Sequence, residues 1–316
     1  MMSPEAPQQW AGGPMYHIPV LCEQVLKLLV TDRSGLYVDG TVGGGGHAAR
    51  LCALLEGEGE LLCIDADREA LDAASARLRD CPRARFLQAN FRELASNLLR
   101  LGLRRPAGLM FDLGVSSHQL DEPARGFSFR NTAPLDMRFD RRQSFSAADV
   151  VNTYDEARLA DVLYRFGEER ASRFIARRII AARPLRTTGD LASAVASAAG
   201  GRFLIKSLAR VFQAVRIEVN QELPALQTAI REGASLLAPG GRLAVISYHS
   251  LEDRIVKEEF RSLAAVSLPS ASRLEADTPV VPTIRLITRH PLKPPEEECR
   301  QNPRARSAKL RVAERV

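Results

Sequence analysis

The chain has 316 residues, of which 45% are hydrophobic and 26% charged, with a formal net charge of +6 and a pI of about 9.3. This composition is typical of a soluble globular protein with one large or two ordinary domains, and no run approaches 18 apolar residues, which excludes a membrane-spanning helix. The basic balance favours a polyanionic partner, although only five of the 44 basic residues are lysines, and arginine abundance also accompanies a GC-rich genome.

Residues 1–16 contain neither a basic start nor an apolar run, so we expect a disordered tail rather than a targeting peptide. The cysteines are scattered, with no CxxC pair and no histidine at ligand spacing: Cys22, Cys52, Cys63, Cys81 and Cys299. This pattern predicts reduced cysteines in a cytoplasmic protein that holds no metal.

From residue 36 onward, short apolar runs alternate with helical patterns. Strands are expected at 36–38, 61–64, 84–88 and 108–113, and helices near 46–56, 67–79 and 91–101. This alternation predicts βαβ units and a parallel sheet. Beyond residue 120 the patterns are helical, including a long one from about 206 to 237, until strands return at 242–247, 283–288 and 308–314. We therefore expect an α/β domain (17–124 and 206–316) interrupted by a helical insertion (125–205).

The first strand runs into the segment Asp-Gly-Thr-Val-Gly-Gly-Gly-Gly-His (39–47), in which glycine dominates the turn before a helix. Such a turn lets a ligand approach the backbone closely and directs the N–H groups of the helix start towards it. No lysine follows the glycines, which excludes the phosphate loop of a P-loop NTPase. The acid Asp39 at the end of the strand favours a cationic ligand.

Polar or aromatic residues also follow the next three strands. Asp65, after the second strand, is placed to accept hydrogen bonds from the ribose hydroxyls of an adenosine cofactor, although a helix cap, which Asp65 or Asp67 could equally provide, is the alternative. Phe91 could cover an adenine ring or belong to the core. Asp112 ends the fourth strand. Because ligands of parallel sheets bind beyond the carboxyl ends of the strands, we expect these residues to form one site.

Several long motifs together resemble the bacterial 16S ribosomal RNA (cytosine-N4)-methyltransferase family. They include Asp-Leu-Gly-Val-Ser-Ser-His-Gln-Leu-Asp (112–121), Arg-Gly-Phe-Ser-Phe-Arg (125–130), Phe-Gln-Ala-Val-Arg-Ile-Glu-Val-Asn (212–220), His-Ser-Leu-Glu-Asp-Arg-Ile-Val-Lys (249–257) and the glycine turn, with further matches at 134–138, 166–170 and 302–307. The resemblance covers nearly the whole chain. It implies a doubly wound, Rossmann-like class I methyltransferase sheet with an inserted all-α domain.

The resemblance also implies a cofactor, a substrate and site residues. The cofactor would be S-adenosylmethionine, contacted by Gly45, Gly46, His47, Asp65, Phe91, Asp112 and Gln119. The substrate would be a cytosine in the decoding region of 16S ribosomal RNA, within a partly or fully assembled small subunit. Sequence leaves the oligomeric state open, with a homodimer as one candidate.

The methylated atom would be an exocyclic amine whose lone pair is delocalised into the cytosine ring. An acceptor at the end of the fourth strand could bind one N4 hydrogen, localise the lone pair and later receive the proton, and Asp112 is the candidate by position. His249, after the fifth strand, is a second candidate. Its alternative role is to cap the next helix, in an arrangement that resembles a capping box.

RNA contacts are expected from the insertion and the loop before it. That loop mixes cations with aromatic rings, as in sites that clamp an extruded base, and Arg125, Phe127, Arg130 and Arg138 are its candidates. A second set, Arg170, Arg173 and Arg177, is predicted to share one helical face opposite Phe174, Ile175 and Ile179, although it could also be ordinary solvated surface. Two other functions remain open: a nicotinamide-dependent dehydrogenase, and a ribosome-assembly factor that binds RNA without turnover.

Overall fold

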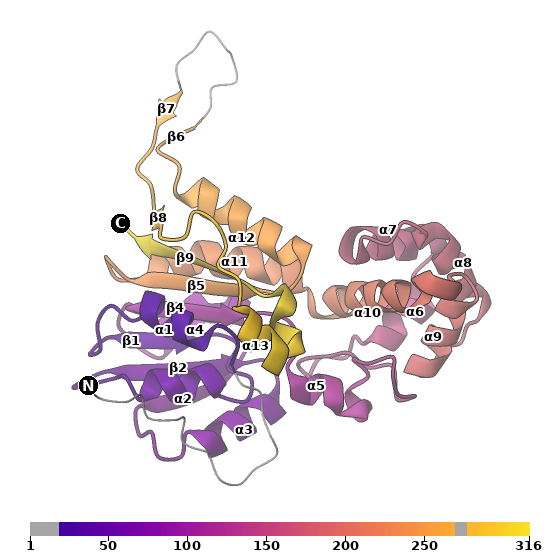
Figure 1. Cartoon of the computed structure of the whole chain (residues 1–316), viewed down its shortest axis with the longest axis horizontal. Coiled ribbons are helices and arrows are strands. Elements are labelled where there is room, and N and C mark those ends of the chain that lie inside the picture. The colour runs from indigo at the N-terminus through magenta and orange to yellow at the C-terminus, as the bar shows by residue number, and fades with distance from the viewer. Residues whose placement is uncertain (1–18, 269–276) are drawn as a thin grey trace.

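The computed structural model describes residues 19–268 and 277–316, so the predicted N-terminal tail (1–16) lies outside the described residues. A seven-stranded sheet with flanking helices forms one part of the molecule, and a helical unit lies beside it (Figure 1). The strands, in the order β3-β2-β1-β4-β5-β9-β8, are β3 (Ala84–Gln88), β2 (Glu60–Asp65), β1 (Leu36–Asp39), β4 (Gly108–Asp112), β5 (Arg242–Ser247), β9 (Lys309–Arg315) and β8 (Ile284–Leu286).

The first five strands pair in parallel, and β9 runs antiparallel between β5 and β8. All seven strands were predicted, within one or two residues at their ends. Consecutive side chains of β2 point to opposite cores: Leu61 and Cys63 to one, Leu62 and Ile64 to the other. Both faces of the sheet are therefore covered, which explains the unbroken apolar runs of its strands.

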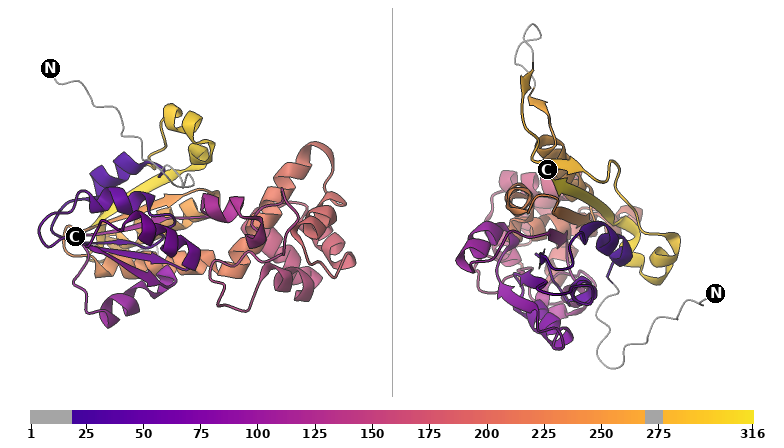
Figure 2. Two further views of the ribbon diagram at one scale, coloured as in Figure 1. Left: turned by 90° about the horizontal axis from the view of Figure 1, so that it is seen from below. Right: turned by 90° about the vertical axis from the view of Figure 1, so that its left-hand side faces the viewer.

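Helices pack on both faces of the sheet (Figure 2). One face is covered by α1 (Cys22–Leu29), α2 (Gly46–Cys52) and α3 (Arg68–Arg77). The other is covered by α4 (Leu94–Arg100), α11 (Glu222–Leu236) and α12 (Ser250–Leu263). Shorter elements are α5 (Ser117–Asp121), α13 (Glu296–Gln301), the two-stranded arm β6 (Ser267–Leu268) and β7 (Thr278–Pro279), and the 3-10 turns η1 (Phe91–Glu93), η2 (Pro123–Arg125), η3 (Gly201–Phe203) and η4 (Pro303–Ser307). The doubly wound α/β fold is confirmed.

The helical unit has its own core. It consists of α6 (Ala147–Thr153), α7 (Glu156–Gly167), α8 (Ser172–Ala181), α9 (Thr188–Ala196) and α10 (Leu204–Asn220). The helix expected from about 206 to 237 is in fact two, because Gln221 adopts a left-handed conformation (φ 51°) between α10 and α11. The apolar face of α10, through Val211, Val215 and Val219, belongs to this core, which thus extends beyond residue 205.

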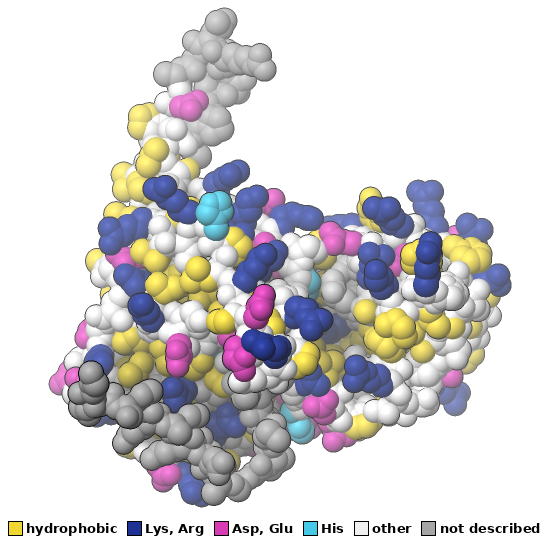
Figure 3. Space-filling view, viewed as in Figure 1, with side chains coloured by type: hydrophobic (Ala, Val, Ile, Leu, Met, Phe, Trp, Pro, Cys, Tyr) yellow, Lys and Arg dark blue, Asp and Glu magenta, His cyan; other side chains and the backbone are white. Residues whose placement is uncertain are grey.

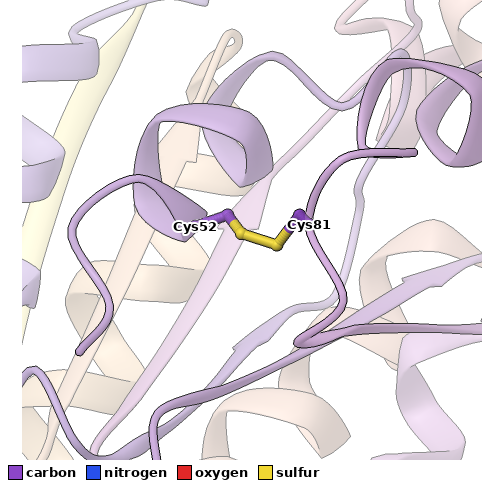
Figure 4. Close-up of a disulfide and its surroundings, with 2 residues drawn as sticks. All are labelled: Cys52 and Cys81. Carbon is purple, nitrogen blue, oxygen red and sulfur yellow. A yellow bond between two sulfur atoms is a disulfide. The ribbon is translucent and has the colours of Figure 1, made fainter. Parts of the chain in front are cut away.

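A disulfide joins Cys52, at the end of α2, to Cys81, which follows α3 (Figure 4). This corrects the prediction that all five cysteines are reduced. The prediction used spacing along the chain, whereas these two cysteines are 29 residues apart and become neighbours because α2 and α3 pack on the same face of the sheet. Cys22, Cys63 and Cys299 are free. Among the described residues, no helix has the length and apolar character needed to cross a bilayer.

Candidate active site

A cavity of about 360 Å³ lies where the parallel strands end. Its wall comes from the segments that follow β1, β2, β3, β4 and β5, together with the junction of α10 and α11. Six of the seven predicted cofactor contacts line it: Gly46, His47, Asp65, Phe91, Asp112 and Gln119. The site is therefore assembled from strand ends, as expected for a parallel sheet.

Gly45 is the exception. It precedes α2 with φ 76°, and a β-carbon added there would lie 3.0 Å from Leu78 Cδ1 and 3.1 Å from Ala74 Cα. An added side chain at Gly45 would therefore meet α3, and Gly45 is not among the residues that line the cavity. Gly43 and Gly44, for which the sequence predicted no contact, line the cavity in its place. The glycine pattern predicted the turn but could not tell which glycine faces which side.

Asp65 connects the glycine turn to β2. Its carboxylate accepts hydrogen bonds from the backbone N–H groups of Gly43 (2.9 Å, Oδ2) and Asp67 (2.9 Å, Oδ1). Burial raises the pKa of Asp65 to about 6, against the opposing effect of these donors. The cap of α3 is Asp67, which accepts from the N–H of Glu69 at 3.1 Å. The capping alternative for Asp65 is thus wrong, and its carboxylate remains on the cavity wall.

Gln119 and Phe91 occupy different parts of the wall. The Gln119 side chain accepts from the N–H of Ser116 (3.0 Å) and donates from Nε2 to Oδ2 of Asp67 (2.7 Å). It therefore forms the capping box of α5 and ties that helix to α3. The ring of Phe91 leans on Phe111, with centroids 5.5 Å apart and planes at 50°, and it also lines the cavity.

Asp112 is held by groups from the segments that follow β1 and β5. Its Oδ1 accepts from the Tyr248 hydroxyl at 2.8 Å, its Oδ2 lies 3.6 Å from Nδ1 of His47, and its backbone N–H donates to Thr41 Oγ1 at 2.6 Å. Burial raises the pKa of Asp112, and His47 and Tyr248 act in the opposite direction. Burial likewise raises the pKa of Tyr248 well above its usual value. Asp112 is therefore a fixed carboxyl group that takes up a proton more readily than an exposed one.

His249 is the N-cap of α12. Its Nδ1 accepts from the N–H of Glu252 at 3.3 Å, so the neutral ring carries its proton on Nε2. Nε2 lies 3.0 Å from Glu252 Oε1, at an angle outside that of a hydrogen bond. Burial favours the neutral form of Glu252, but His249 and Arg216 outweigh it and lower the Glu252 pKa. To accept a proton on Nδ1, His249 would have to abandon the cap, so the structure favours its capping role.

The junction of α10 and α11 completes the wall with residues to which the sequence assigned no role. Arg216 forms a paired contact with Glu222 at 2.8 and 2.9 Å. The Asn220 amide accepts from the N–H of Phe139 (2.8 Å) and donates to the carbonyl of Met137 (2.7 Å), which fixes the loop before the helical unit. Arg216 and Asn220 lie within the motif at 212–220, so a signal was present but carried no geometry. Tyr248 could have been found by extending the strand-end argument to β5.

The loop around 125–138 differs from its predicted role as an RNA clamp. Arg125 is only 1% exposed, and its Nη1 contacts Asp67 (2.6 Å) and Glu69 (3.1 Å). Phe127 is 6% exposed and stacks on Phe139. The burial of Arg125 and Phe127 contradicts direct RNA contacts by either residue. Arg138 forms an ion pair with Asp136 at 2.7 Å. Arg130 is exposed, and its predicted RNA contact remains a prediction.

The second predicted arginine set is exposed, but its geometry also differs. Arg170 precedes α8, whereas Arg173 and Arg177 lie on it, and Arg177 pairs with Glu156 at 3.2 Å. Phe174, which was expected in the apolar stripe, is 43% exposed, whereas Ile175 and Ile179 are buried. Within residues 19–268 and 277–316, no cluster of His, Cys, Asp or Glu is placed to hold a metal ion.

Five parallel strands are followed by an antiparallel strand pair, and the strand-end residues Asp65 and Asp112 line a cavity at the edge of the sheet. This is the architecture of a class I methyltransferase. Residues 14–316 match the MraW methylase family. The chain is 47% identical over 309 residues to "Ribosomal RNA small subunit methyltransferase H" of Acaryochloris marina, covering 96% of both chains. The protein of the same name from Dehalococcoides mccartyi is 46% identical over 302 residues, which cover 95% of this chain and 86% of the relative.

The chain therefore belongs to the MraW methylase family, with S-adenosylmethionine as its methyl donor. Membership of this methylase family excludes the alternative function of a nicotinamide-dependent dehydrogenase. Among solved structures, an rRNA methylase from Streptococcus thermophilus is similar at 12% identity, covering 93% of both chains with a TM-score of 0.41.

Proposed function

We propose that this protein methylates the exocyclic N4 amine of a cytidine in the decoding region of 16S ribosomal RNA, within the small ribosomal subunit. Family membership and the names of the relatives support the coarser function, S-adenosylmethionine-dependent methylation of ribosomal RNA. The observation that carries the finer proposal is Asp112, a constrained carboxyl group with a raised pKa at the end of β4.

The cavity wall suits the methyl donor. Asp65 would accept hydrogen bonds from the two ribose hydroxyls, and Phe91 would cover the adenine face. The rest of the cofactor could approach the backbone from Gly43 to His47 closely, since the glycines that line the cavity have no side chains. Gln119 would act mainly by holding Asp67 and α5 in place, because both ends of its amide are already bonded.

When bound, the cofactor supplies a sulfonium-linked methyl group. Transfer forms the N4–CH₃ bond, breaks the S–CH₃ bond and leaves the amine with one proton to lose. One Asp112 oxygen would accept an N4–H hydrogen bond, localise the lone pair on nitrogen and then take that proton. The Tyr248 hydroxyl would keep the carboxyl group aligned, and Thr41 would fix the Asp112 backbone. In-line positioning of the amine and the methyl group can contribute roughly 7–11 kcal/mol in favourable intramolecular cases.

The test is methylation of unmodified small subunits with isotopically labelled S-adenosylmethionine, followed by nucleoside mass spectrometry. We expect labelled N4-methylcytidine at one position. Asp112→Asn should slow transfer at least about 100-fold, with S-adenosylhomocysteine affinity changed only a few-fold. Asp72→Asn, at an exposed position on α3, serves as the control. Label on another atom would overturn the N4 assignment, and RNA binding without label transfer would favour the non-catalytic assembly factor.

A further inference from the structure

Two phenylalanines of the helical unit are exposed to solvent with an arginine over each ring. Phe174 on α8 is 43% exposed, and the Arg178 guanidinium carbon lies 5.1 Å from its ring centroid. Phe203, in the turn before α10, is 56% exposed, with Arg202 at 4.7 Å. Neither ring contributes to the core of the helical unit. Exposed rings beside arginines offer flat faces on which a nucleobase can stack.

The segment that carries these two ring–arginine pairs has a large excess of basic over acidic residues. Residues 170–210 contain nine arginines and lysines and one acid, Asp190, an excess of eight positive charges in a chain whose net charge is +6. In the described part of the chain, only two of these nine cations form an ion pair, Arg177 with Glu156 and Arg210 with Glu169. The other seven form none with any described residue: Arg170, Arg173, Arg178, Arg183, Arg186, Arg202 and Lys206. Unneutralised cations beside exposed stacking rings are complementary to a polyanion with exposed bases.

This surface lies away from the cavity. Figure 1 shows α8 and α9 at the end of the helical unit farthest from the sheet, and α9 contacts both α8 and α10. Dark-blue cationic side chains surround yellow apolar ones over this part of the molecule (Figure 3). The 17 residues of α10 span about 25 Å. They separate Phe203 at one end from Asn220, which lines the cavity, at the other.

We propose that the helical unit carries a second RNA-binding surface, on which Phe174 with Arg178 and Phe203 with Arg202 stack unpaired nucleotides. The length of α10 places Phe203 about 25 Å from the cavity. This inference rests on the proposed function, since it assigns a further contact to the same substrate. The surface would anchor the RNA and would leave the chemistry at Asp112 untouched. Its removal should therefore raise the KM for small subunits and leave kcat unchanged.

The test compares Phe174→Ala/Phe203→Ala with Phe174→Tyr/Phe203→Tyr, which keeps the rings. Leu99→Ala, at an apolar residue that is 85% exposed on α4, is the matched control. Binding of a fluorescent single-stranded oligouridine and of a duplex of equal length is measured by anisotropy. We expect the alanine pair to weaken single-strand binding about tenfold or more, with little effect on the duplex. The tyrosine pair and the control should match wild type, and all variants should bind S-adenosylhomocysteine normally.

Two results would overturn the proposal. Unchanged oligouridine affinity and an unchanged KM for small subunits would show that neither ring contributes to RNA binding. Unchanged oligouridine affinity with a raised KM would assign the surface to a protein of the subunit. Either result is compatible with N4-methylcytidine formation by the wild type, so failure here is distinguishable from failure of the proposed function.

Discussion

Three carboxyl groups, Asp39, Asp65 and Asp112, lie close together at the ends of β1, β2 and β4. Burial raises the pKa of Asp39 to about 8 and that of Asp65 to about 6, and also raises that of Asp112. Mutual repulsion adds to the effect at Asp39. Asp65 and Asp112 line the cavity, whereas Asp39 is buried and does not. A positively charged sulfonium in the cavity would favour the charged forms of Asp65 and Asp112, whereas the neutral sulfide left after transfer would not. We therefore expect the site to bind the substrate form of the cofactor more tightly than the product.

Asp65 provides the most direct test of the cofactor assignment. Asp65→Ala should weaken S-adenosylhomocysteine binding at least about tenfold, because hydrogen bonds to a charged acceptor contribute about 1.5–3 kcal/mol. The carboxylate is the accepting form and its pKa is about 6, so affinity should fall as the pH is lowered from 7 to 5. Calorimetry across this range checks both effects.

Two variants sharpen the measurement at Asp65. Asp65→Asn should show a flatter pH dependence than the wild type, since it cannot be protonated there. Asp72→Ala removes an exposed carboxylate seven residues further along and should bind normally. Equal affinity of Asp65→Ala and wild type would remove the ribose role.

Gly45 and Gly43 offer a matched pair for separating backbone strain from crowding. Both have positive φ, but an added β-carbon meets Ala74 and Leu78 at Gly45 and nothing nearer than 4.0 Å at Gly43. Gly43→Ala should lower the unfolding free energy by about 1–2 kcal/mol, because alanine is strained in the left-handed conformation. Gly45→Ala should lower the unfolding free energy further, because its side chain also meets α3. Denaturant unfolding measures both variants, and equal decreases would show that α3 shifts to accommodate the added methyl group.

At the scale of elements, sequence predicted what depends on local periodicity. The strands were found because buried runs such as 61–64 and 242–247 are short, apolar and bounded by turns. The break between α10 and α11 was missed because Gln221 is an unusual residue for a left-handed conformation. Pro224, in the first turn of α11, is a sequence signal for the start of a new helix and could have marked the break. The roles of Arg125 and Phe127 were missed because burial depends on tertiary contacts with α3 and Phe139, which composition does not encode.

Arg125 tests this correction at the element scale. Its guanidinium links the loop before the helical unit to the start of α3 through Asp67 and Glu69. Arg125→Ala should lower the unfolding free energy by about 3–5 kcal/mol, since it leaves a buried carboxylate of Asp67 without its cation. The exposed Arg130→Ala should change it by less than about 0.5 kcal/mol. A stable Arg125→Ala protein with weakened RNA binding would instead assign Arg125 a direct contact with RNA.

The Cys52–Cys81 disulfide connects the end of α2 with the segment after α3. These two helices support the glycine turn. Closing a loop of this length should stabilise the fold by about 3–4 kcal/mol. Reductant should therefore lower the unfolding midpoint of the wild type and leave Cys52→Ser/Cys81→Ser unaffected. Thiol titration after non-reducing denaturation should give three free thiols, and a count of five would show that the pair is reduced.

For the whole molecule, the proposed cofactor site and the proposed RNA-binding surface lie in regions of different charge. Asp65 and Asp112, at strand ends of the sheet, line the cavity, whereas the excess positive charge lies on α8, on the segment between α8 and α9, and around the start of α10. The connection through Gln221 and the contact of Glu168 with Ser250 (2.6 Å) and Arg254 (3.3 Å) hold the two parts together beside the cavity. Net charge alone suggested a polyanionic partner, but only the fold shows that the cations gather on one unit.

This separation gives the final prediction. Arg170→Gln/Arg173→Gln/Arg177→Gln should weaken RNA association and reduce the slope of log affinity against log salt by up to about 2, at about 0.7 for each single-strand phosphate that is no longer neutralised. Arg177 should contribute least, because Glu156 already neutralises it at 3.2 Å. S-adenosylhomocysteine binding should be intact, since the cavity lies at the other end of α10. The control, Arg79→Gln/Arg92→Gln/Arg261→Gln, removes the same charge from positions around the sheet. If both triple variants lower the slope equally, the effect reflects net charge rather than an RNA-binding face.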